Sequence, residues 1–179
     1  MEERWSQGRW GMNDGAVRWG PSTARLIALA TLRVFVGWHF LYEGLVKLFN
    51  PHWTAAEYLA QSQGPFSGVF HWLVAEPSRL ALVDALNSWG LVLIGLGLMA
   101  GFLTRYATLA GIVLLGLYYL CHPPFPTYAS SLPAEGSYLI VDKILIELVA
   151  LWVLLVFPTG SVVGLDRLLI RKQSAGDIP

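Results

Sequence analysis

Four long hydrophobic segments are separated by more polar connections along the chain, and the lengths of the hydrophobic segments predict helices that cross a membrane. A helix needs roughly 20 consecutive apolar residues to cross a bilayer. Asn50 and Pro51 end the first segment and Pro158 ends the last, because proline cannot continue a helix. The sequence therefore predicts an all-α, integral membrane four-helix bundle. The spans are expected at about 26–49, 80–103, 106–121 and 138–157 within a transmembrane domain of residues 25–158.

The connection between the first two spans, residues 51–77, is too polar to cross a membrane. Thr54 and Glu57 have the spacing of a capping box that opens a short helix. Residues 66–74 are apolar and aromatic but too short to span, which predicts an interfacial or re-entrant segment.

The two ends of the chain are polar and basic. Residues 1–24 form an arm with an Arg-Trp dipeptide at 4–5, 9–10 and 18–19, and residues 159–179 form a tail that is amphipathic over 164–172. Four spans place both ends on one side. The basic residues of that side outnumber those of the opposite loops, which hold Arg79, so the positive-inside rule predicts cytoplasmic N and C termini. The basic residues on the predicted cytoplasmic side are Arg4, Arg9, Arg18, Arg25, Arg105, Arg167, Arg171 and Lys172.

One face of the first span carries costly polar groups. At helical spacing, one narrow stripe of this face contains Arg33, Gly37, Phe40, Gly44 and Lys47. Glu43 lies beside it, and His39 is one turn before Glu43. An ionisable group at membrane depth costs about 2.5–3.5 kcal/mol on insertion scales. We therefore expect the stripe to face other helices or a wet cavity.

Partners for these groups are available on the fourth span. At about 1.5 Å per residue, Glu43 and Lys143 lie at similar depths, as do His39 and Glu147. We expect an ion pair between Glu43 and Lys143, and a second one between Glu147 and either His39 or Arg33. Asp142 lies near the level of Lys47, and His122 closes the outer end of the third span. The polar residues thus gather in the outer half of the membrane. They form either a functional site or ion pairs that only stabilise the packing of the bundle.

Composition narrows the function. The chain is 55% hydrophobic and 13% charged, against about 25% charged in soluble domains, and its 12 basic and 12 acidic residues disfavour a nucleic-acid binder. Cys121 is the only cysteine, which excludes a CxxC centre, an intrachain disulfide and a thiolate zinc cage. Gly97 and Gly101 form a small-xxx-small pattern that allows close helix approach.

A quinone headgroup suits the predicted polar cluster. It needs donors for two carbonyl oxygens, a group that passes a proton, and flat apolar walls. His39, Glu43, Lys143 and Glu147 are the candidate catalytic residues. Arg33, Lys47, Asp142 and His122 are further candidate contacts. The candidate aromatic walls are Trp38, Tyr42, Trp89, Tyr118 and Tyr119. A haem or a metal is not expected, because His39 is the one histidine placed inside a span and no tight ligand spacing occurs.

Three stretches resemble the DoxX family of small four-helix bacterial membrane proteins. They are the Arg33-x3-Gly37-x2-Phe40-x3-Gly44-x2-Lys47 stripe, residues 97–105, and residues 135–147 together with the His-Pro-Pro-Phe segment at 122–125. The resemblance covers about residues 25–170. Many members carry an acidic residue early in the second helix, where this chain offers Asp84 and Asn87.

The resemblance implies a multi-pass protein of the bacterial cytoplasmic membrane. The family includes the membrane subunit of a thiosulfate:quinone oxidoreductase and subunits of other redox complexes. We therefore expect a subunit of a quinone-linked oxidoreductase or respiratory-type complex. Thiosulfate is one candidate electron donor, and the expected partners are lipids, quinone and other subunits. A non-catalytic assembly subunit is the alternative reading. A small-solute transporter is a third, weakened by the absence of an inverted repeat.

Overall fold

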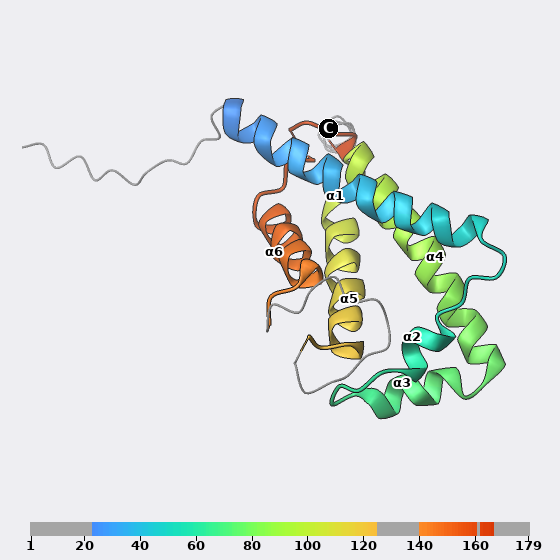
Figure 1. Ribbon diagram of the computed structural model, residues 1–179. Helices are drawn as coiled ribbons and strands as arrows, with labels where there is room; N and C mark the ends of the chain where they lie inside the picture. The colour runs from blue at the N-terminus through green and yellow to red at the C-terminus, as the bar shows by residue number, and fades with distance from the viewer. Residues whose placement is uncertain (1–22, 125–139, 161, 167–179) are drawn as a thin grey trace, which may run out of the picture.

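The computed structural model describes residues 23–124, 140–160 and 162–166. In that part of the chain every regular element is a helix (Figure 1). Three of the helices, α1, α4 and α5, are long and apolar enough to cross a membrane. The bounds are α1 Thr23–Phe49, α2 Ala56–Ala60, α3 Ser67–Val74, α4 Pro77–Ala100, α5 Thr104–Cys121 and α6 Lys143–Val156.

The three candidate spans occupy the first three predicted segments, and α4 is shifted toward the N-terminus. It begins at Pro77, whose missing N–H is no loss in the first turn of a helix. It ends where Gly101 adopts a left-handed conformation (φ 64°) and donates to the carbonyl oxygen of Leu98 at 3.3 Å. The fourth predicted span holds α6, which has 14 residues. The arm up to residue 22 and the tail from residue 167 lie outside the described residues.

Helices α1 and α4 pack closely because glycines remove side chains from their crossing. A Cβ on Gly44 would lie 2.7 Å from Cγ2 of Val92, and one on Gly95 would collide with the backbone of Leu41. The predicted stripe of α1 does face another helix. The sequence pointed instead to Gly97 and Gly101, but Gly97 lies against Ala107 of α5 and Gly101 forms the C-cap of α4.

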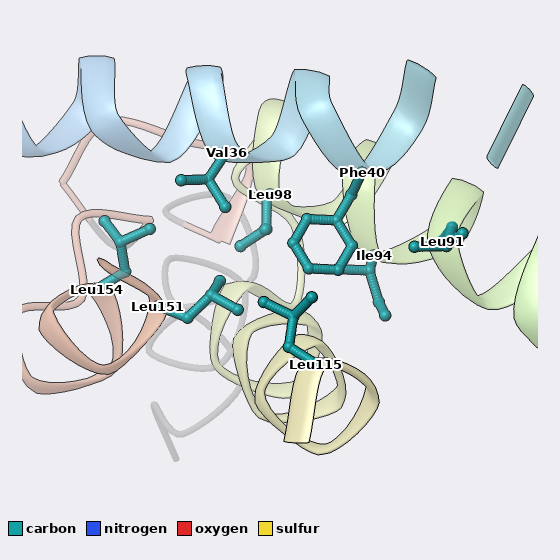
Figure 2. Packing of buried hydrophobic residues seen from close by; sticks show 8 residues of the cluster. All are labelled: Val36, Phe40, Leu91, Ile94, Leu98, Leu115, Leu151 and Leu154. Carbon is teal, nitrogen blue, oxygen red and sulfur yellow. The ribbon is translucent and has the colours of Figure 1, made fainter. Parts of the chain in front are cut away.

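The main core lies where α1, α4, α5 and α6 meet, and Figure 2 shows its side chains pointing toward one another. Phe40 of α1 reaches into the centre and is 2% exposed. Leu98 of α4 and Leu151 of α6 are fully buried beside it. The remaining members of the cluster are Val36, Leu91, Ile94, Leu115 and Leu154.

The short helices α2 and α3 form a cap on the N-terminal half of α4 (Figure 1). Asp84 of α4 accepts from Thr54 Oγ1 at 2.9 Å and from the Ala55 N–H at 2.8 Å. Ser62 Oγ donates to the carbonyl oxygen of Cys121 at 2.8 Å. The capping-box prediction was wrong, because Ala55 is the N-cap of α2 and the carboxylate that serves this turn comes from Asp84. Residues 67–74 form α3.

Candidate ligand cavity between α1, α6 and the cap

A cavity of about 640 Å³ lies between the long helices and the cap, and all six helices contribute to its lining. Its charged residues come from α1 and α6, and we call them the polar wall. Helices α3, α4 and α5 supply a largely apolar wall that includes Phe70, Val83 and Leu114. The cavity therefore has one charged side and one mostly apolar side. The polar wall consists of His39, Glu43, Lys47, Lys143 and Glu147.

His39 and Glu147 join α1 to α6 within the polar wall. The Nδ1 atom of His39 lies 2.7 Å from Oε1 of Glu147. The side chain of Glu147 is 13% exposed and that of His39 is 49% exposed. His39 is one of the two partners that the sequence predicted for Glu147, and the contact leaves part of the imidazole facing the cavity.

Glu43 makes a different ion pair from the one predicted. Its Oε2 accepts from Lys47 Nζ at 2.7 Å, one turn further along α1. Residues at i and i+4 are neighbours on a helix, so this pair needs no second element. Lys143, the predicted partner, begins α6 and lies within electrostatic range of both Glu43 and His39. The polar wall thus holds two carboxylates, two ammonium groups and one imidazole.

Arg33 lies outside the cavity and anchors the segment that follows α6. It is 3% exposed. Its Nη1 donates to Thr159 Oγ1 at 3.0 Å, and its Nη2 donates to the carbonyl oxygen of Val163 at 2.6 Å. The guanidinium also lies against Gly101, at the turn between α4 and α5. The predicted role of Arg33 as a contact of a bound cofactor therefore has no geometric support.

Four further predicted contacts also lie outside the cavity. Trp38 and Trp89 are 53% and 57% exposed on the outer surfaces of α1 and α4. Asp142 caps α6, because its Oδ1 accepts from the Leu145 N–H at 2.8 Å. His122 Nε2 lies 2.6 Å from the carbonyl oxygen of Tyr58, and the two rings lie 4.3 Å apart at a tilt of 56°. Asp142 and His122 therefore have structural contacts, with α6 and with the cap.

Of the aromatic groups that line the cavity, Tyr118 was a predicted wall residue, whereas Tyr58 and Trp53 were not predicted. Tyr118 of α5 donates a hydrogen bond to Asn87 Oδ1 of α4. Tyr58 of the cap donates to the carbonyl oxygen of Tyr118 at 3.2 Å, and burial raises the pKa of the Tyr58 phenol, so it stays a neutral donor. Both phenols and the Trp53 ring line the cavity. The apolar and aromatic composition of residues 66–74 was the available signal for the α3 side.

Comparison with known proteins agrees with the helical arrangement. The family model for DoxX matches residues 28–123, from the first turns of α1 to just beyond the end of α5. No curated protein matches the chain, and neither does any solved structure. The apolar helices and the matched region together make this a multi-pass membrane protein. The match covers more than half of the sequence, and the chain belongs to the DoxX family.

Proposed function

We propose that this protein is the membrane subunit of a quinone-linked oxidoreductase complex and that the cavity is its quinone site. The observation that carries the proposal is the division of the cavity into a charged wall on α1 and α6 and an apolar wall on α3, α4 and α5. A quinone has the same division, with two carbonyl oxygens on a flat apolar ring.

The dimensions and chemistry of the cavity suit such a ligand. Its volume of about 640 Å³ falls within the roughly 300–1,000 Å³ typical of small-molecule sites. Lys47 and Lys143 are cationic hydrogen-bond donors for a carbonyl oxygen of the quinone. Tyr118 and Trp53 supply aromatic rings beside the quinone ring. Aromatic walls with a few placed polar groups are typical of binding sites for small apolar molecules.

The His39–Glu147 pair is the candidate proton relay. Reduction of a quinone takes up two electrons and two protons, and in this proposal the electrons come from a redox subunit of the complex. The 2.7 Å contact between the imidazole and the carboxylate lets a proton move between them. Glu43 holds Lys47 at the cavity, and the ammonium group orients the oxygen that receives the proton.

We further propose that α6 is a fourth span and that the cavity opens toward the outer side of a bacterial cytoplasmic membrane. Helix α6 is about 21 Å long at 1.5 Å per residue, shorter than a bilayer core, yet it presents Ile146, Val149 and Trp152 outward. The excess of basic residues at the two chain ends supports cytoplasmic termini. Fusion of a periplasmic reporter enzyme after residue 130 and after residue 179 tests this, since reporter activity is expected from the first fusion alone.

Quinone reduction by isolated membranes tests the proposed function. Glu147→Gln and Glu43→Gln remove a charge from the polar wall with little change of shape. Glu57→Gln, on the exposed face of α2, is the matched control. We expect the first two variants to assemble in normal amount and to lose at least tenfold in quinone reduction, a typical effect of a lost proton-transfer group.

The alternative, an assembly subunit without chemistry, predicts a different pattern. In that case loss of Glu147 lowers the yield of the complex, and the activity per complex stays at the wild-type level. Equal activity in Glu147→Gln and Glu57→Gln would likewise contradict the proposed site.

A further inference from the structure

Five apolar residues that line the cavity are also exposed. Phe66, the N-cap of α3, is 51% exposed, and Val69 of α3 is 56% exposed. Leu86 of α4 is 64% exposed, and Leu117 and Leu120 of α5 are 47% and 39% exposed. We call these five residues the apolar rim. A residue that both lines a cavity and faces outward marks the place where the cavity opens.

The position of the apolar rim indicates what the opening faces. Leu86, Leu117 and Leu120 lie on α4 and α5, two of the helices able to cross the membrane. The surface of such a helix that is not covered by protein is covered by lipid. His39 and Glu43 are also half-exposed, but they bring polar atoms to the α1 side, where a hydrocarbon chain gains nothing.

We propose that the cavity has a lateral portal to the bilayer between α3, α4 and α5, and that its ligand is a two-part molecule. A polar headgroup lies against the polar wall, and an apolar tail leaves through the apolar rim into the lipid. This inference rests on the proposed function and specifies it, because it requires a quinone with a hydrocarbon tail that arrives from the membrane and not from water.

Hydrogen bonds attach the cap to the long helices, which supports a portal that is already open without ligand. Asp84 accepts hydrogen bonds from Thr54 and Ala55, and Ser62 donates one to the carbonyl oxygen of Cys121, so both ends of α2 are tied to long helices. Phe70 of α3 belongs to the buried cluster beneath the cap, whereas Val69 and the N-cap residue Phe66 lie at the opening. The tail therefore meets a preformed apolar edge.

A binding measurement with matched variants tests the portal. The full chain, purified into phosphatidylcholine nanodiscs, is titrated with a tritiated decyl-tailed benzoquinone in a scintillation proximity assay. Unlabelled competitors are the same benzoquinone without a tail and undecanoic acid, a tail without the quinone head. Leu86→Trp and Leu117→Trp obstruct the portal. Leu93→Trp is the control for α4, being 64% exposed on the same face two turns away, and Val113→Trp is the control for α5.

We expect the hydrocarbon tail to increase the affinity of the quinone, and this increase to require an open portal. The tailed quinone should bind roughly tenfold or more tightly than the tail-free one, because its methylenes are buried at the rim. Leu86→Trp and Leu117→Trp should remove most of that difference, whereas Leu93→Trp and Val113→Trp should keep it. All four positions face outward, so monodisperse elution is expected of each variant.

The contrary outcomes separate the two proposals. If both quinones bind saturably and each binds Leu86→Trp as tightly as it binds Leu93→Trp, the portal is overturned and the quinone site is not. Competition by undecanoic acid as strong as that by the tailed quinone, lost in Leu86→Trp, identifies the occupant as an acyl chain and overturns the quinone assignment. Absence of saturable binding of either quinone overturns both.

Discussion

The imidazole of His39 contacts the carboxylate of Glu147 at 2.7 Å, and the two residues are 108 positions apart in the sequence. This contact joins α6 to α1 within the polar wall, beside the core packing of the two helices. The same pair therefore contributes to the packing of the bundle and to the chemistry of the cavity, and an experiment has to separate the two contributions.

A double-mutant cycle on the pair makes that separation. We expect His39→Leu or Glu147→Leu alone to lower the free energy of unfolding by about 1–3 kcal/mol, because each leaves a partly buried polar partner unsatisfied. The double variant should recover part of this loss, since both polar groups are then removed. Thermal unfolding in detergent measures the stability. Quinone binding should be weak in all three variants, and full binding by the double variant would contradict the role of the pair.

Packing of α1 on α4 depends on Gly95. We expect Gly95→Ala to destabilise the protein by about 1–3 kcal/mol, because the added methyl group collides with the backbone of Leu41. Gly90→Ala is the matched control on the same helix, where a Cβ meets nothing within 4 Å. That variant should be neutral or more stable by up to about 1 kcal/mol. Equal melting temperatures of the two variants would argue against the close crossing.

Arg33 stabilises the end of the bundle that is remote from the cavity. We expect Arg33→Gln to lower stability by about 1.5–3 kcal/mol, because it removes charged hydrogen bonds to Thr159 and Val163. Arg105→Gln, at an exposed position, should change little. Quinone affinity measured on the folded fraction should be unchanged in both variants. A large loss of affinity in Arg33→Gln would place Arg33 in the site after all.

Cys121 reports occupancy of the cavity. It lines the cavity, is 1% exposed, and is the only thiol in the chain. We expect a bound tailed quinone to slow alkylation of this thiol by N-ethylmaleimide several-fold, because the ligand blocks the approach through the cavity. Mass spectrometry of the intact chain measures the rate. Equal rates with and without the quinone would show that the ligand binds elsewhere.

Periodicity and apolar length predicted the helices well, since both depend on each segment alone. The stripe from Arg33 to Gly44 indicated the buried face of α1 because glycines and an arginine at helical spacing are unfavourable toward lipid. The family was also identified from these residues. For α6 the structure describes a helix shorter than the predicted span.

The site was harder to predict, because it depends on which helices are neighbours. Equal depth suggested Lys143 for Glu43, whereas Lys47 on the same helix is closer and needs no docking. Trp38 and Trp89 have the chemistry of a quinone wall but point outward. Phe40 of α1 and Tyr118 of α5 do line the cavity. The other aromatic groups come from the cap and the segments beside it, whose placement depends on Asp84 and on the carbonyl groups at the end of α5.

The quinone content of the purified protein tests the central claim most directly. Protein purified from native membranes in mild detergent is extracted with organic solvent, and the quinone is quantified per chain. We predict close to one quinone per wild-type chain and per Glu57→Gln chain, and a several-fold lower content in Glu147→Gln. Wild-type protein with no quinone above the level of a control membrane protein, or Glu147→Gln protein with a full complement, would contradict the proposed site.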